Sequence, residues 1–255
     1  MHNAALAQAG LQYIYIPLSV LPEDIGQAIL SLKALGIVGV NLTIPHKQRV
    51  IPYLDEISSE AVAIGAVNTV INSEGKLKGT NTDGIGFTRS LVENNFELMG
   101  KRAVVLGAGG ASRSVVYQML SECSKVTVVS RDADQAKKMI AELSGSRQVC
   151  ETQSLTYSDI GIVAKVVGEA DILVNATSVG MHPNVNEHPP IDTSLLNSKA
   201  FVYDLIYNPV ETKLLSNCGS RGIRTLNGLS MLVHQGAESF RLWTGVDPDV
   251  ECMYR

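Results

Sequence analysis

The feature that most constrains the fold of this chain is a glycine-rich stretch, AVVLGAGGASRSVVYQML, which begins at Ala103. Four apolar residues predict a buried strand, and the apolar residues after the glycines recur at helical spacing. Glycines between a strand and a helix let the backbone turn tightly and approach a pyrophosphate, which the helix start attracts. We therefore predict a dinucleotide-binding turn rather than a plain tight turn. The expected cofactor contacts are Gly107, Ala108, Gly109, Gly110, Ala111 and Ser112.

Ser112 stands where this type of turn usually has its third glycine. A serine is small and polar, so it can cap the helix or donate a hydrogen bond to a phosphate. We expect one of these two roles for Ser112.

The end of the next strand bears on the choice of dinucleotide. The strand VTVVS ends at Ser130, and Arg131 and Asp132 follow it. A carboxylate at this position typically holds the ribose of NAD, whereas an arginine accepts the 2′-phosphate of NADP. Because the arginine comes first, the order favours NADP, with Ser130 and Arg131 in the cofactor site. If Arg131 is only a solvated charge, the choice stays open.

Strand-like and helical segments alternate along the chain, which indicates an α/β fold with a parallel sheet covered by helices. We expect two domains with a boundary near residue 84: a substrate domain over 1–84 and a Rossmann-type, doubly wound domain over 85–228. Strands are predicted at 13–18, 37–44, 102–106, 125–130, 171–175 and 201–206, a hairpin around 73–75, and helices at 24–35, 85–94 and 228–244.

Composition and charge exclude several classes of function. The net charge of the 255 residues is −4 and there is no run of basic residues, so a nucleic-acid partner is not expected. No apolar run reaches the roughly 20 residues of a membrane span, and the N-terminus lacks the features of a secretory signal. The four cysteines and five histidines are widely scattered. We therefore expect a cytoplasmic protein with free thiols and without a metal site.

A second polar motif, NLTIPHK, runs from Asn41 to Lys47 at the end of an apolar segment. Pro45 cannot donate to a sheet, so the strand should end before it. Residues after a strand end are where α/β folds usually bind ligands. Lys47 is therefore a candidate functional residue, although a lysine in such a place is usually only solvated.

Seven motifs then occur in one order: NLTIPHK, GAVNT (65–69), NTDGIGF (81–87), VLGAGGAS (105–112), NATSVGM (175–181), YDLIYNP (203–209) and NGLSMLVHQG (227–236). Together they resemble the shikimate dehydrogenase family over essentially the whole chain. The resemblance implies two α/β domains, with the C-terminal helix, 229–255, returning to the first. It also implies interconversion of shikimate and 3-dehydroshikimate, a step of aromatic amino acid biosynthesis, with NADP.

The resemblance implies roles for individual residues. Lys47 and Asp83 would be catalytic, with Asp83 orienting Lys47, because a nearby carboxylate favours the ammonium form of a lysine. The residues expected to contact the substrate are Thr43, Asn68, Tyr207 and Gln235. Thr177 is expected on the cofactor side, and Gly228 and Met231 at the nicotinamide end.

The chain departs from the family pattern in two places. The family begins with a strand and a loop whose two serines hold the substrate carboxylate, whereas this chain opens at Met1-His2-Asn3. We therefore expect such a segment upstream of Met1, and without it weak substrate binding. The second departure is Gln135, where the family often has a further basic residue.

Three functions remain open on the sequence. The first is an NADP-dependent shikimate dehydrogenase, a monomer or homodimer that acts on a small molecule. The second is an NAD-preferring quinate/shikimate dehydrogenase, which Asp132 and Gln135 allow. The third is a cofactor-binding relative with impaired catalysis, since a site without its anion donors binds poorly.

Overall fold

The computed structural model describes residues 1–145 and 150–255, and it divides the chain into two compact units. Unit 1 consists of Met1–Ser90 and Met231–Arg255, and unit 2 of Leu91–Ser230. The division falls within helix α5 (Asp83–Glu93), and it groups most of helix α10 (Leu229–Thr244) with the N-terminal residues.

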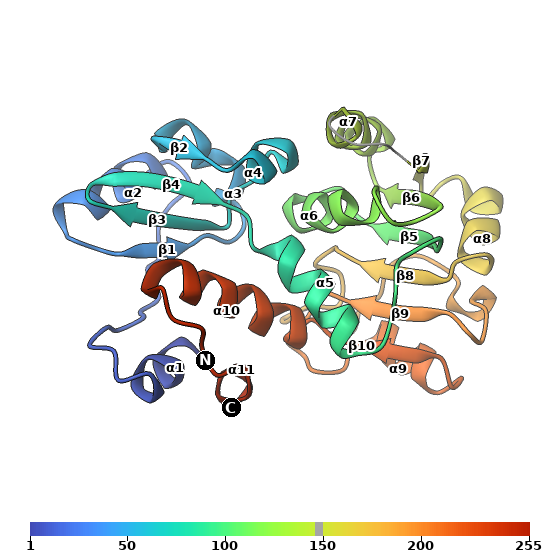
Figure 1. The fold of residues 1–255 in the computed structure, drawn as a ribbon. Helices are drawn as coiled ribbons and strands as arrows, with labels where there is room; N and C mark the ends of the chain where they lie inside the picture. The colour runs from blue at the N-terminus through green and yellow to red at the C-terminus, as the bar shows by residue number, and fades with distance from the viewer. Residues whose placement is uncertain (146–149) are drawn as a thin grey trace. The chain divides into compact units, whose positions relative to one another are not determined.

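Unit 2 contains a parallel sheet of six strands in the order β10-β9-β8-β5-β6-β7 (Figure 1). The order reverses direction between β5 and β8, which is the switch point where doubly wound sheets bind ligands. The strands are β5 (Arg102–Leu106), β6 (Lys125–Ser130), β7 (Glu151–Thr156), β8 (Ile172–Asn175), β9 (Phe201–Asp204) and β10 (Arg224–Leu226).

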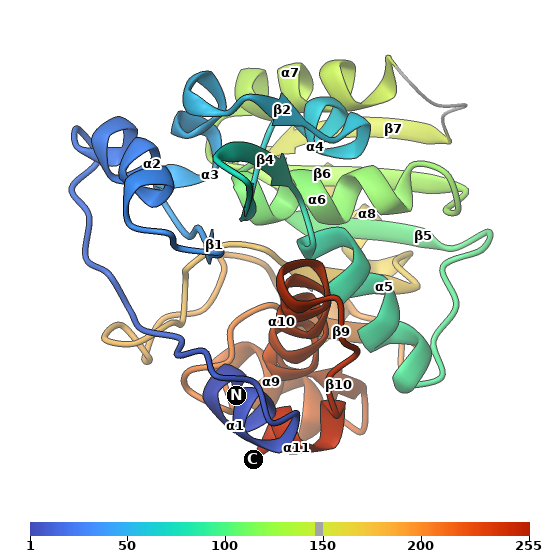
Figure 2. The same cartoon turned by 60° about the vertical axis from the view of Figure 1, so that its left-hand side comes forward.

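Helices connect these strands, as parallel pairing requires. They are α6 (Gly110–Met119), α7 (Ala133–Ser144), α8 (Ile160–Gly168), η2 (Thr193–Leu195) and α9 (Lys213–Gly219). Figure 2 shows α6 in front of β5 and β6. The inner strands β5, β8 and β9 are buried along almost their whole length, so unit 2 has an apolar core that fixes their ends.

Unit 1 contains a mixed sheet of four strands in the order β1-β3-β4-β2. Its strands are β1 (Gly39–Asn41), β2 (Glu56–Ile57), β3 (Thr69–Ser73) and β4 (Lys76–Thr80). Strands β3 and β4 form the predicted hairpin. Its two turn residues, Glu74 and Gly75, have φ values of 53° and 81°, the left-handed pair that a tight two-residue hairpin requires.

The helices of unit 1 range in length from three residues to sixteen. They are α1 (His2–Gln8), α2 (Ile25–Ala34), α3 (His46–Arg49), η1 (Ile51–Tyr53), α4 (Ser59–Ile64), α10 and α11 (Val250–Tyr254), with the start of α5. Helix α2 confirms the predicted helix at 24–35 to within a residue at each end, and Gly36, with a φ of 61°, follows it. In the part of the chain that the structure describes, no helix is long and apolar enough to cross a bilayer.

The predicted strand at 13–18 is wrong. These residues form no regular element, and Ile14 and Leu18 are 76% and 59% exposed. The backbone amide and carbonyl of Tyr15 instead pair with the side chain of Asn3, at 2.7 and 2.9 Å. Alternation of apolar residues predicts a strand only where a neighbouring strand supplies ladder partners, and this segment has none among the described residues.

Three strands were not predicted. β7 has the sequence ETQSLT and lies at one edge of its sheet, where exposure removes the need for apolar residues. β2 and β10 are only two and three residues long. The predicted strand at 37–44 is also shorter in the structure, since β1 covers only Gly39–Asn41.

Asp204, at the end of β9, is a buried carboxylate in unit 2 with an exposed fraction of 0%. Burial raises the pKa of Asp204 from 3.8 to about 6, although hydrogen bonds from Thr212, Ile206 and Asn175 oppose the shift. Between about pH 4 and 6 the folded protein therefore holds a proton that the unfolded chain has lost. The stability contribution of Asp204 consequently falls as pH rises through this window.

We predict that Asp204→Asn removes this pH dependence. The free energy of unfolding of the variant relative to the native protein should rise from pH 4 to pH 7 by on the order of 3 kcal/mol. Denaturant titrations at several pH values measure the difference. The control is Asp192→Asn, because hydrogen bonds from Ser194 lower the pKa of this fully exposed carboxyl and give a trend of opposite sign. A difference that stays flat with pH for Asp204→Asn would contradict the prediction.

Candidate functional site

Lys47 and Asp83 form an ion pair in unit 1. The chain leaves β1, passes Pro45 and begins the short helix α3, whose second residue is Lys47. Lys47 Nζ donates to Asp83 Oδ2 at 2.7 Å, and the two side chains are only 15% and 7% exposed. The structure therefore brings together the two residues predicted to be catalytic, although 35 residues separate them in the sequence.

The orientation of the Asp83 carboxylate is set by its other contacts. Asp83 is the first residue of α5, and its backbone amide donates to Asn81 Oδ1 at 3.0 Å. Its second carboxylate oxygen, Oδ1, accepts a hydrogen bond from Asn68 Nδ2 at 2.8 Å. Both carboxylate oxygens thus have a donor, which a buried ion pair needs to be stable.

Asn68 connects the ion pair to helix α10. Its Oδ1 accepts from the backbone amide of Thr82 at 2.8 Å, and its Nδ2 lies 3.3 Å from Gln235 Oε1. Helices α5 and α10 approach closely at Gly86, where a Cβ would lie 2.7 Å from the carbonyl oxygen of Met231. The lack of a side chain at Gly86 therefore allows Gln235 to reach Asn68.

Four further polar residues extend this network and were not predicted. Ser239 is fully buried; its hydroxyl accepts from Asn41 Nδ2 at 2.9 Å and hydrogen-bonds with Thr69 at 2.9 Å and Thr82 at 3.3 Å. Ser239 lies one helical turn after Gln235, so its spacing on α10 was a signal that could have identified it. The unpredicted members of the network are Asn41, Thr69, Thr82 and Ser239.

The remaining predicted substrate residues do not join this network. Thr43 is exposed in the segment between β1 and α3. Tyr207 belongs to unit 2, where it is 50% exposed in the loop after β9. His46 has a structural contact, because its Nε2 lies 3.1 Å from the carbonyl oxygen of Val20.

The arrangement can exchange a proton with a ligand. An ammonium group that is held by a carboxylate, and is still partly accessible, can donate a proton to a ligand oxygen or take one back. Asn68 and Gln235 carry amide groups within the same network, and such groups can orient hydroxyl groups of a small molecule. Unit 1 therefore holds a polar site suited to a hydroxylated ligand.

The glycine turn of unit 2 has the geometry of a phosphate-binding turn. Strand β5 ends at Leu106, and Gly107 has a φ of 101°, which only glycine adopts easily. Gly109 is the N-cap of α6, and a Cβ at Gly109 would meet no atom within 4 Å. The backbone at Gly109 is therefore open to a ligand at the start of the helix.

Ser112 does not have the first of the two roles predicted for it, because it does not cap the helix. It lies inside α6 and is fully buried, and its hydroxyl donates to the carbonyl oxygen of Gly107 at 2.6 Å. The N-cap is Gly109, and the proton of Ser112 is used to close the turn. Ser112 thus stabilises the turn instead of capping the helix, and its contact with a phosphate stays a prediction.

Two other predicted cofactor residues lie against backbone. Thr177 Cγ2 would be 2.9 Å from a Cβ at Gly107, so the Thr177 loop contacts the glycine turn. Gly228 lies under the loop after β9, where a Cβ would come within 2.0 Å of the carbonyl oxygen of Leu205. Met231, in contrast, is buried in unit 1.

At the end of β6, Ser130 is buried and its hydroxyl donates to the carbonyl oxygen of Asp132. The carboxylate of Asp132 caps α7, accepting from the amides of Asp134 and Gln135 at 3.0 Å each. Arg131 is exposed, and within 1–145 and 150–255 no ion pair of Arg131 is found. The arginine is therefore available to a ligand, whereas the carboxylate already has two partners.

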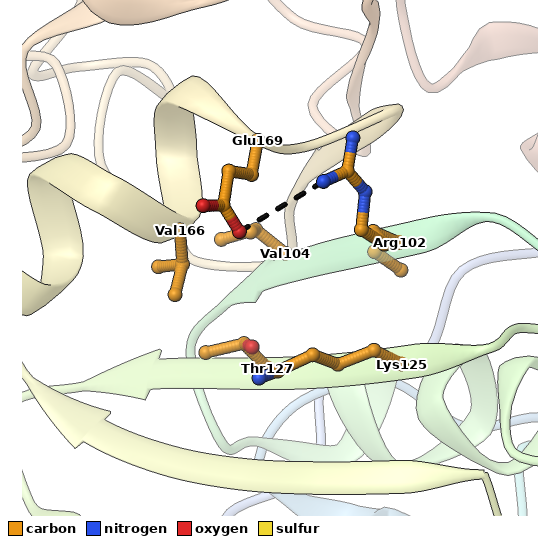
Figure 3. A pocket seen from close by; sticks show the side chains of 7 residues that line it. Arg102, Val104, Lys125, Thr127, Val166 and Glu169 are labelled. Atoms are coloured by element: carbon orange, nitrogen blue, oxygen red, sulfur yellow. Dashed lines mark ion pairs between the residues drawn. The ribbon is translucent and has the colours of Figure 1, made fainter.

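A small hollow lies at the start of β5 and β6, at the other end of these strands from the glycine turn, and it is not a ligand site. Arg102 and Lys125, which begin β5 and β6, line it together with Glu169 (Figure 3). Its volume is about 10 Å³, enough for one water molecule, and Arg102 and Glu169 approach to 3.8 Å beside it. Over the described ranges, no group of three or more His, Cys, Asp or Glu residues could hold a metal ion.

Three family profiles match successive parts of the chain. Residues 1–70 match the shikimate dehydrogenase substrate binding domain, residues 90–204 match shikimate / quinate 5-dehydrogenase, and residues 228–255 match the shikimate 5'-dehydrogenase C-terminal domain.

Relatives match over almost the whole chain. A shikimate dehydrogenase (NADP(+)) of Carboxydothermus hydrogenoformans is 43% identical over 99% of this chain and 89% of its own length. A crystal structure of a shikimate dehydrogenase in complex with NADP+ has a TM-score of 0.90 and 39% identity, and covers 99% of this chain and 87% of its own. The shikimate 5-dehydrogenase of Listeria monocytogenes, in complex with shikimate and NAD, has a TM-score of 0.90 and 33% identity, with 99% and 88% covered. This chain belongs to the shikimate dehydrogenase family.

Proposed function

We propose that this chain is an NADP-dependent shikimate dehydrogenase, which reversibly oxidises shikimate to 3-dehydroshikimate in aromatic amino acid biosynthesis. The observation that carries the proposal is the Lys47–Asp83 ion pair at 2.7 Å, with Asn68 on the second oxygen of the carboxylate. The family membership names the substrate class, and the ion pair supplies the proton chemistry that the oxidation of an alcohol needs.

The proposed roles in unit 1 follow from the charges of the residues. NADP, when bound, supplies the nicotinamide that accepts the hydride from the substrate carbon. Lys47, as the free amine, takes the proton of the substrate hydroxyl, and as the ammonium returns a proton to the carbonyl oxygen in the reverse direction. Asp83 stays ionised and holds the amine, while Asn68, Gln235 and Thr43 orient the substrate.

The residues of unit 2 fit a dinucleotide. A side chain at Gly109 would occupy the open space at the start of α6, and the absence of one leaves room for a pyrophosphate. Thr177 lies against the same turn, and Gly228 belongs to a neighbouring loop, while Tyr207 remains a proposed substrate contact. We assign the turn from Gly107 to Ser112 to cofactor binding.

The proposed preference for NADP over NAD rests on two neighbouring residues, Arg131 and Asp132. Arg131 is exposed and accessible, so it can accept the 2′-phosphate. Asp132 is used as the N-cap of α7, which weakens its candidacy as the ribose-binding carboxylate of an NAD enzyme. The second candidate is an NAD-preferring quinate/shikimate dehydrogenase, favoured by the complex of the Listeria relative with NAD.

The proposed setting is the cytoplasm, because the four cysteines are free thiols, as a reducing compartment maintains them. The oligomeric state, a monomer or a homodimer, stays a prediction. The proposed partners are small molecules only.

We predict that Lys47→Ala lowers kcat for shikimate oxidation by about 100- to 10,000-fold, because the general base is lost. The affinity for NADP should stay within about twofold. Absorbance of NADPH and titration calorimetry measure the two quantities. Lys33→Ala is the control, since Lys33 pairs with Asp55 at 2.8 Å on the exposed surface of the same unit. Near-normal turnover in Lys47→Ala would refute the catalytic role, and a native protein that binds NADP without oxidising shikimate would favour the impaired relative.

We predict that Ser239→Ala lowers the free energy of unfolding by about 1–3 kcal/mol, because it removes the hydrogen bonds of Ser239 with Asn41 and Thr69, each worth roughly 0.5–1.5 kcal/mol. The kcat should also fall several-fold, since these groups share hydrogen bonds with Asn68. The matched control is Ser31→Ala. Ser31 also donates to the carbonyl four residues earlier, at 2.8 Å, but is exposed. Equal effects of the two substitutions would show that the buried network adds nothing.

We predict that Arg131→Ala raises the KM for NADP about tenfold or more and leaves the KM for NAD nearly unchanged, because only NADP carries the 2′-phosphate. Initial rates with each cofactor at saturating shikimate provide the comparison. Lys138→Ala, which removes an exposed cation from the following helix α7, is the control. If Arg131→Ala changes both KM values equally, Arg131 does not select the cofactor.

A further inference from the structure

Asp204 accepts hydrogen bonds from three different segments of unit 2. Its Oδ1 accepts from Asn175 Nδ2 at 3.0 Å and from the amide of Ile206 at 3.1 Å. Its Oδ2 accepts from Thr212 Oγ1 at 2.6 Å. Strand β8, the loop after β9 and the start of α9 therefore meet at one buried carboxylate.

The carboxylate fixes which way the amide of Asn175 faces. Since Asp204 only accepts, the NH₂ group of Asn175 must face it, and the amide oxygen must face the other way. That oxygen accepts from the amide of Thr177 at 3.1 Å and from its hydroxyl at 2.7 Å. The Thr177 hydroxyl in turn accepts from the amide of Val179 at 3.1 Å. The direction of each hydrogen bond in this series is therefore set by the ionised carboxylate of Asp204.

The series ends at the glycine turn. Thr177 Cγ2 lies where it would be 2.9 Å from a Cβ of Gly107. The position of the Thr177 side chain, which contacts the glycine turn, is thus linked to Asp204 through Asn175.

A second branch leads to the neighbouring loop. Thr212 donates to Asp204 and caps α9 by accepting from the amide of Leu215 at 3.3 Å. The amide of Gly228 donates to the carbonyl oxygen of Ile206 at 2.9 Å, so the backbone held by Asp204 also supports Gly228. The loops that follow β8 and β9 therefore both depend on this carboxylate.

A stabilising role alone does not explain why the carboxylate of Asp204 is buried here. The groups facing Asp204 from β8, the loop and α9 are neutral donors, and burial raises its pKa to about 6. A buried carboxylate without a cation costs free energy. Above about pH 6, however, the ionised carboxylate only accepts, and it then determines the direction of every hydrogen bond around it.

We propose that Asp204 is a positioning residue of the cofactor site, which orients Asn175 so that Thr177 is held against the glycine turn. This inference rests on the proposed function, because it takes the turn at Gly107 to be where the dinucleotide binds. Asp204 acts through Asn175 and Thr177 and need not touch the cofactor.

The test measures three quantities in matched variants: the NADP affinity by titration calorimetry, the KM for shikimate, and the melting temperature. Asp204→Ala removes the acceptor, and Asn175→Asp keeps the shape but replaces the donor with a second carboxylate. Both should weaken NADP binding about tenfold or more, since the loop loses its orientation, and leave the KM for shikimate within about twofold. Asp204→Asn keeps an oxygen for Asn175 and should restore affinity to within about threefold of the native value.

Two further variants separate the possible failures. Asp192→Ala, which removes an exposed N-cap carboxylate of the same unit, should leave NADP affinity unchanged. Gly109→Leu places a side chain in the open space at the turn, where its Cβ would meet no atom within 4 Å, and should abolish NADP binding. If Gly109→Leu binds NADP normally, the proposed cofactor site is wrong. If Gly109→Leu fails to bind but Asp204→Ala and Asn175→Asp bind normally, even with lowered melting temperatures, the role of Asp204 is purely structural and the inference is overturned.

Discussion

The carboxylate of Asp83 is the interaction on which the polar site of unit 1 depends. One of its oxygens accepts from Lys47 and the other from Asn68, and the side chain is only 7% exposed. A buried ion pair is favourable only when its remaining hydrogen-bonding capacity is also satisfied. Asn68 meets that need, but its own oxygen must then find donors, and the amide of Thr82 is one of them. The groups of the site are therefore connected by hydrogen bonds, and each group is held in position by the next.

The accuracy of the strands predicted from the sequence depended on how deeply each strand is buried. β5 and β6 were predicted with their observed bounds, because inner strands of a parallel sheet are apolar throughout. β7 was missed because an edge strand can be polar, and the segment at 13–18 was wrongly predicted because alternation says nothing about whether a partner strand exists. The pattern of apolar residues indicates how buried a segment is, whereas the pairing of a strand depends on the whole sheet.

The site was predictable only in part, for a related reason. A lysine after a strand and an aspartate at a helix start are each common in solvent, and it was the resemblance to a family that singled out Lys47 and Asp83. Ser239 could not be recognised in this way, because a serine on a helix reveals its burial only when the sheet beneath it is known. Asp204 carried a stronger signal, since it follows three apolar or aromatic residues in a strand that should be buried. A charge in such a place indicates a role that packing cannot explain.

Asp83 and Asp204, buried carboxylates of unit 1 and unit 2, solve different physical problems. Asp83 is paired with the cation Lys47, which in the proposed mechanism gives up and regains a proton while Asn68 continues to donate to the carboxylate. Such a pair suits a group that must alternate between two charge states. Asp204 has only neutral donors, none of which changes charge during turnover. Its hydrogen bonds therefore keep one direction throughout, as a residue that holds a binding loop in one geometry requires.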